Sequence, residues 1–134
     1  MKNINEEDWE HLETISVQQL DTMKGKSPLG FYYLGVSLYK MNYFDQSVKA
    51  FLKSDDLKKN NPDLHYNLGL TYFKLEHYSL AVEHLTKCTK LNPIHKFAFN
   101  NLAFIFNMHE YYSETIAICS KAELNIIEHQ MNQK

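Results

Sequence analysis

The sequence predicts an all-α fold made of three consecutive helix pairs. Gly35, Gly69 and Ala103 recur every 34 residues, each directly after a Leu and three residues before a large apolar side chain. Proline follows Ser or Asn near the start of each unit, which is typical of a helix beginning. A repeat of this length is typical of stacked helix–turn–helix units, so nearly the whole chain is expected to be one repeated architecture.

Small residues recur at two further positions of the repeat. When Gly35, Gly69 and Ala103 are counted as position 8, positions 20 and 27 also hold only small side chains. These are Ser47, Ala81 and Thr115, then Ser54, Cys88 and Ala122. Two helices approach closely only where the side chains at their crossing are small. We therefore expect position 8 of each first helix to pack against positions 20 and 27 of the second.

The helix boundaries follow from candidate N-cap residues. Ser27, Asn61 and Asn92 each precede a proline and are expected to cap the first helix of a unit. A second set of candidate caps opens the second helices, namely Asp45, Ser79 and Ser113. The predicted helices are 28–41, 45–58, 62–75, 79–91, 93–108 and 113–128.

Residues 1–27 are predicted to form one more helix, with Asn5 as its N-cap and Lys24-Gly25 at its end. On the phase of the repeat, Val17 and Leu20 fall at positions 24 and 27. We expect this N-terminal helix to cap the first unit, as terminal repeats usually require. The alternative is a regulatory helix that enters the binding groove or docks on a partner.

The repeat resembles the tetratricopeptide repeat, which has Leu-Gly at positions 7 and 8, Tyr at 11, Ala at 20, a large apolar residue at 24 and Pro at 32. The middle unit matches best, through Leu68-Gly69, Tyr72, Ala81, Leu85 and Pro93. Departures are His65 at position 4, Cys119 at position 24 and Lys59 at position 32. The resemblance implies a right-handed α-solenoid, with repeats at 28–61, 62–95 and 96–129 inside a domain spanning 28–134 that ends in a short polar tail.

Composition excludes several classes of partner. The net charge is −2, and the fourteen basic residues are all Lys, so the chain lacks the Arg side chains that recognise phosphates and bases. We expect no nucleic-acid partner. No signal peptide or long apolar run is present, so we also expect no membrane partner and a cytoplasmic or other soluble intracellular location.

No residue pattern indicates catalysis. His84 and Cys88 are four residues apart, a spacing that allows two metal ligands on one helix face. Cys88 and Cys119, however, fall on inward positions of the repeat and are interpreted as core residues, while His84 is expected near the surface. The other histidines are scattered singly. We expect no enzymatic activity, no metal and no cofactor.

The resemblance implies that the first helices of the units line a concave groove. Its candidate partner-binding residues are mostly aromatic or aliphatic: Tyr32, Val36, Tyr39, Tyr66, Asn67, Leu70, Phe73, Phe97, Asn101 and Phe104. An apolar groove favours an apolar peptide or an amphipathic helix as its occupant. The alternative is that these side chains lean into the helix interfaces and are covered from within.

A narrower function of the family is tested on the same positions. Repeats that clamp the acidic C-terminus of heat-shock chaperones use Lys and Asn where this chain has Tyr32, Val36, Asn67, Phe97 and Asn101. Only Asn67 matches. A carboxylate would therefore have no cation to neutralise it, and the sequence favours capture of a hydrophobic segment instead.

The last helix is expected to expose an apolar end, since no further capping helix follows in the sequence. Ile118, Ile126 and Ile127 are the candidate C-terminal stacking surface, for a partner subunit or for end-to-end self-association. The function predicted from the whole sequence is a non-enzymatic interaction module, a subunit or adaptor of a larger assembly. The alternative is a chaperone or co-chaperone that shields hydrophobic client segments.

Overall fold

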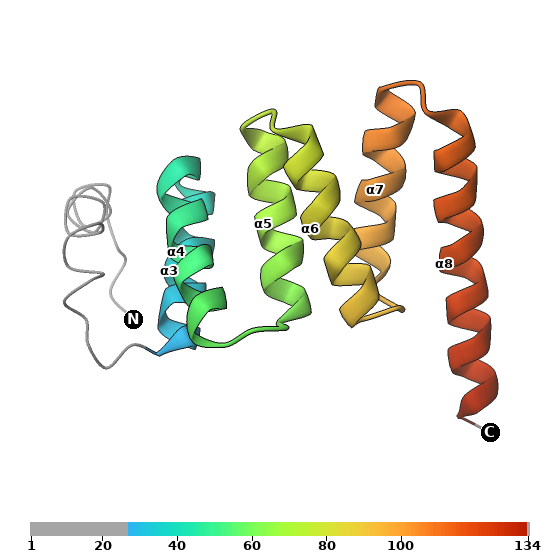
Figure 1. Cartoon of the computed structure of the whole chain (residues 1–134), viewed down its shortest axis with the longest axis horizontal. Coiled ribbons are helices and arrows are strands. Elements are labelled where there is room, and N and C mark those ends of the chain that lie inside the picture. Colours follow the sequence, from blue (N-terminus) through green and yellow to red (C-terminus); the bar gives the residue numbers. More distant parts are fainter. Residues whose placement is uncertain (1–26, 134) are drawn as a thin grey trace, which may run out of the picture. The chain divides into compact units, whose positions relative to one another are not determined.

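The computed structural model describes residues 27–133, which form six α-helices and no strand (Figure 1). The helices are α3 (Pro28–Lys40), α4 (Phe44–Leu57), α5 (Pro62–Lys74), α6 (Tyr78–Leu91), α7 (Lys96–Met108) and α8 (Tyr112–Asn132). The all-α helical-repeat prediction is confirmed. The predicted N-terminal capping helix lies outside the described residues.

The chain divides into two compact units. The first ends at Lys59 and contains α3 and α4; the second starts at Asn60 and contains α5 to α8. In the second unit the helices lie side by side in chain order, with contacts between each consecutive pair (Figure 1).

Two of the three predicted caps of first helices are confirmed. The Ser27 hydroxyl accepts a hydrogen bond from the Gly30 amide at 3.2 Å, and the Asn61 side chain accepts from the amides of the first turn of α5. The third cap is wrong, because α7 begins at Lys96 instead of residue 93. Asn92 accepts from the Ile94 amide and closes a turn, and the His95 ring accepts from the first turn of α7 at 3.1 Å.

The predicted caps of the second helices are also wrong. Helices α4, α6 and α8 begin one residue before Asp45, Ser79 and Ser113, and their N-cap residues make no side-chain cap bond. The turn before each helix fixes the start. Its residue at position 15 has a left-handed backbone, and the next amide donates to the carbonyl five residues back, as in a Schellman motif. These left-handed residues are Asn42, Glu76 and Glu110.

Position 8 contacts position 20, as predicted, and it packs most tightly against position 24, which the prediction did not include. A Cβ added at Gly69 would lie 2.6 Å from Leu85 Cγ and 3.3 Å from the Ala81 carbonyl oxygen. A Cβ added at Gly35 would lie 2.7 Å from the Phe51 ring. Glycine is therefore required because a large side chain at position 24 fills the space where a Cβ would project.

In the first unit, positions 20 and 27 tie the two helices together by hydrogen bonds. The buried Ser47 hydroxyl donates to the Gly35 carbonyl at 2.7 Å, and the Ser54 hydroxyl donates to the Pro28 carbonyl at 2.6 Å. Small polar side chains therefore occupy these positions because they both fit and satisfy backbone acceptors.

The core of the second unit is formed between α6 and α7. Its buried members are Ala81, Leu85 and Cys88 from α6 and Ala98, Leu102 and Ile105 from α7. Each helix contributes three residues at spacings of four and three, two small and one large from α6 and one small and two large from α7, so the two faces fit closely. This contact holds α7 in place and positions the side chains on its exposed face.

Candidate partner-binding site

The first unit supplies three of the candidate groove residues, all from α3. Tyr32, Val36 and Tyr39 are half-buried. The Tyr32 ring lies 5.9 Å from the Phe51 ring, and the Tyr39 ring lies 5.5 Å from the Phe44 ring. Both tyrosines thus contribute to packing between α3 and α4, as the alternative of internal coverage expects for part of the set.

The second unit exposes a larger aromatic surface on α7. Phe97 is 64% exposed and Phe104 57% exposed, and Met108 continues the same helix face. The Phe104 ring meets the Phe73 ring of α5 edge to face at 5.9 Å, and the Phe97 ring lies 6.4 Å from the Tyr66 ring. We call these five residues the aromatic face.

The aromatic face is held in place by contacts at the start of α7. The Tyr66 ring lies 4.8 Å from the His95 ring, and His95 Nε2 lies 3.3 Å from a carboxylate oxygen of Asp63. Burial raises the pKa of Tyr66, and a hydrogen bond with the Asn101 side chain partly offsets this shift. The phenol is therefore neutral at pH 7, and the face carries no formal charge on its rings.

The two candidate asparagines bond to their own helices. Asn67 donates to the Asp63 carbonyl at 2.9 Å, and Asn101 donates to the Phe97 carbonyl at 2.7 Å. Leu70 of α5 is half-buried. Both amides thus use one donor on backbone four residues earlier.

A histidine pair in the second unit was missed at the sequence level. His65 is buried, and its Nδ1 lies 3.1 Å from Nδ1 of His84, with the two rings stacked at 5.3 Å. The Tyr72 ring also stacks with the His84 ring, with their centroids 5.4 Å apart. His84 is therefore half-buried between α5 and α6, and the signal was its place one residue before the core position of Leu85.

Metal binding finds no support around this pair. Within residues 27–133, no three His, Cys, Asp or Glu side chains gather closely enough to hold a metal ion. Two nitrogens 3.1 Å apart form a hydrogen bond in which one ring donates and the other accepts. The pair is thus a packing contact of α5 and α6.

The predicted C-terminal stacking surface is only partly on the outer side of α8. Ile118 packs against the core between α6 and α7, so its assignment is wrong, whereas Ile126 lines an open pocket between α7 and α8. Ile127 is 51% exposed, and the outer side also carries Ile116, Leu124 and Met131. The error arises because α8 is apolar on two opposite sides, which the sequence pattern does not separate.

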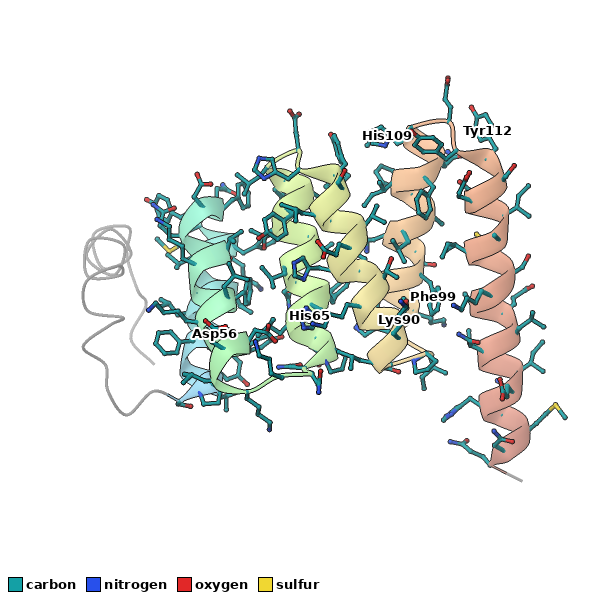
Figure 2. The ribbon with its side chains drawn as sticks, viewed as in Figure 1. Asp56, His65, Lys90, Phe99, His109 and Tyr112 are labelled. Carbon is teal, nitrogen blue, oxygen red and sulfur yellow. The ribbon has the colours of Figure 1, made fainter. Side chains whose placement is uncertain are left out.

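Cys119 corrects a further prediction, since it is exposed instead of buried, whereas Cys88 is buried as expected. Cys119 lines the pocket between α7 and α8, which has a volume of about 210 Å³. The walls are mostly apolar and consist of Pro93, Ile94, Lys96, Phe99, Asn100, Cys119, Ala122, Glu123 and Ile126. Figure 2 shows Phe99 near the start of α7, at the end opposite His109 and Tyr112.

Comparison with known proteins identifies the repeat. A family model described as "Tetratricopeptide repeat" matches residues 62–95, the predicted middle unit, and a model described as "TPR repeat" matches residues 35–76. A comparison with curated proteins finds no match. In the described part of the chain, no helix is both long and apolar enough to cross a membrane.

Solved structures show the same fold at low sequence identity. The crystal structure of MamA has a TM-score of 0.73 at 17% identity, covering 96% of this chain and 78% of that one. The first TPR of Spaghetti (RPAP3), bound to the HSP90 peptide SRMEEVD, has a TM-score of 0.67 at 18% identity, covering 73% of this chain and 78% of that one. The two family models show that the chain carries tetratricopeptide repeats over residues 35–95, and the solved structures show the same helical-repeat fold.

Proposed function

We propose that the aromatic face of α5 and α7 holds an apolar peptide or amphipathic helix of a partner protein, without chemistry of its own. Tetratricopeptide repeats support protein–protein interaction in general, and the exposed aromatic face carries the more specific proposal. Phe97 and Phe104 lie seven residues apart with both rings more than half exposed. Rigid aromatic rings give a large contact area at low entropic cost, which suits anchor residues of an interface.

The polar groups on this face argue for an apolar partner segment. The rim offers the Asn101 amide and the Tyr66 phenol, and Phe97 stands at the repeat position where a carboxylate clamp uses Lys. An acidic tail such as the one bound to the RPAP3 domain would have its charge desolvated without compensation. The acidic peptide is therefore the negative control of choice.

Binding of a model helix tests the proposal. The probe is a Leu/Lys amphipathic peptide of about five helical turns, compared by calorimetry with a scrambled peptide of the same composition. We expect the amphipathic peptide to bind, the scrambled one to bind at least tenfold more weakly, and the peptide SRMEEVD to show no binding. Equal affinity for the ordered and scrambled peptides would contradict recognition of a helix face.

Substitutions then locate the contact. Phe97→Ala and Phe104→Ala remove exposed rings, so both variants should keep the wild-type melting temperature and lose binding. The matched control is Ile116→Ala, which removes a side chain of similar exposure from the outer side of α8. If the control weakens binding as much as the two phenylalanine variants do, the aromatic face is not the site.

A chaperone that shields hydrophobic client segments would use the same exposed rings, and the RPAP3 domain with its HSP90 peptide motivates this second candidate. The two functions differ in the lifetime of the complex. Recovery of the partner in stoichiometric amount after purification supports the subunit or adaptor, whereas release of the partner during its folding or delivery supports the chaperone.

A further inference from the structure

The contact between α6 and α7 shows how one helix of this protein docks on the next. The face of α6 presents position 20, 24 and 27 residues, Ala81, Leu85 and Cys88. The face of α7 that packs against it has a small residue followed four and seven residues later by aliphatic residues: Ala98, Leu102 and Ile105. All six side chains are at most 3% exposed, so this pairing of patterns makes a closed interface.

Helix α8 presents the same positions next to α7, but no second helix covers them among the described residues, as α7 does on α6. Thr115, Cys119 and Ala122 occupy positions 20, 24 and 27, and none of them is buried. Cys119 and Ala122 form one wall of the 210 Å³ pocket, and Phe99 and Asn100 of α7 form part of the other. We call this surface the acceptor groove.

The outer side of α8 carries the complementary pattern. Ser120 is followed four residues later by Leu124 and seven residues later by Ile127, the same spacing as Ala98, Leu102 and Ile105. All three residues are exposed, Leu124 at 65%. We call these three residues the donor stripe.

We propose that a second copy of this chain docks its donor stripe into the acceptor groove, head to tail. The groove takes a stripe of this spacing in the α6–α7 contact, and α8 exposes such a stripe. The corresponding pairs are Leu124 with Cys119, Ser120 with Ala122, and Ile127 with Thr115. This proposal is independent of the aromatic face and stands whether or not that face binds a partner.

The geometry determines how the assembly grows. Donor stripe and acceptor groove are different surfaces of α8, so the contact is heterologous and each bound copy still presents a free groove. Unless the rotation closes a ring, copies add in a row as concentration rises. A symmetric pair formed by two identical surfaces would stop at the dimer.

Two charge-introducing variants separate the surfaces. Leu124→Glu disables the stripe and leaves the groove, and Cys119→Glu disables the groove and leaves the stripe. Both residues are exposed, so both variants are expected to fold, which thermal melting checks. Ser79→Glu, at an exposed position of α6, adds the same charge elsewhere and serves as the control.

Sedimentation velocity of the full chain gives the readout. We expect the wild type and Ser79→Glu to grow with concentration beyond the 15.8 kDa monomer, and each disabling variant to stay monomeric. An equimolar mixture of Leu124→Glu and Cys119→Glu should form a dimer and stop there, because one groove and one stripe remain. Alkylation of Cys119 in the wild type should slow as concentration rises.

Three outcomes would overturn the proposal. A wild type that stays monomeric at every concentration leaves the groove for a helix of another protein. If the wild type stops at a dimer, and the mixture of Leu124→Glu and Cys119→Glu forms no complex, the contact is symmetric. Growth that survives both disabling variants places the interface elsewhere.

Discussion

Helix pairs α5–α6 and α7–α8 share one repeat register but differ in how well their second helix is buried. Helix α6 buries Ala81, Leu85, Cys88 and Thr89, whereas α8 has no buried residue. The difference has two sources. Helix α6 lies between α5 and α7, and its Leu85 fills the space above Gly69, while α8 contacts α7 and has Cys119 at the position of Leu85.

This difference teaches that the second helix of a repeat completes its core only when another helix follows it. The small pair Ala103 and Cys119 replaces the Gly69 and Leu85 pair, and a pocket opens beside it. The apolar residues that α8 keeps on its outer side then have no described neighbour to cover them. Both proposals of binding concern surfaces that α7 and α8 leave open.

The largest effect is expected at position 24. Leu85→Ala removes a fully buried side chain and should lower the free energy of unfolding by about 2–5 kcal/mol, since it leaves a cavity. Cys119→Ala at the same position of α8 should change it by less than about 0.5 kcal/mol, because Cys119 is exposed. Urea denaturation measures both. Equal losses would show that α8 is as well packed as α6.

Position 8 should give the next largest effect. Gly69→Ala places a Cβ 2.6 Å from Leu85 Cγ, so overpacking should cost about 1–3 kcal/mol. In a Leu85→Ala background the clash with Leu85 is absent and only the 3.3 Å contact with the Ala81 carbonyl oxygen remains, so the better helix propensity of Ala should gain up to about 1 kcal/mol. The double-mutant cycle checks this change of sign. A cost that persists without the Leu85 side chain would place the clash elsewhere.

The Cys88 thiol should make the stability of the fold depend on pH in the alkaline range. Burial raises the pKa of Cys88 from its ordinary 9.0 to about 12, so the folded state favours the neutral thiol. This contribution to stability is present below pH 9 and falls as pH rises toward 12, by about 1.4 kcal/mol per pH unit. Cys88→Ala should reduce the slope of unfolding free energy against pH between 9 and 11. If the slope is unchanged, groups other than Cys88 cause the loss of unfolding free energy at alkaline pH.

The smallest effects should be equal in the two helix pairs. Glu76 and Glu110 both have a left-handed backbone, with φ of 60° and 65°, in the turn between first and second helix. Glycine adopts this conformation without the steric cost of a Cβ, so Glu76→Gly and Glu110→Gly should each stabilise by about 0.5–1 kcal/mol. Glu83→Gly, inside α6, is the control and should destabilise. Different changes in melting temperature for Glu76→Gly and Glu110→Gly would show that the two turns are not equivalent.

Much of the fold could be predicted because its determinants are local in the sequence. The 34-residue period of small residues and the proline-preceded caps Ser27 and Asn61 predicted the helix pairs and placed most boundaries within one residue. The turns were mispredicted because residues such as Glu76 do not signal a left-handed backbone. There the hydrogen bonds of the helix end determine the conformation, and the side chain has little influence.

The candidate site was predictable in part for the same reason. Phe97 and Phe104 could be assigned to one helix face from their spacing, and that face is exposed. Tyr32 and Tyr39 have equivalent spacing, yet they pack on rings of α4, and His65 meets His84 across two helices. Such contacts depend on which side chains of a neighbouring helix reach the same place.

The sequence by itself determined the helical repeat, the neutral aromatic character of the first helices and the small residues at the helix crossings. Tertiary structure alone decided that Ile118 faces the core and Ile127 the outside, that Cys88 is buried and Cys119 exposed, and that Leu85 requires Gly69. The physical reason is that the repeat period is set by residues close together in the sequence, whereas the burial of a side chain depends on which helix packs opposite it. Among the described residues, α8 has a neighbouring helix, α7, on one side only.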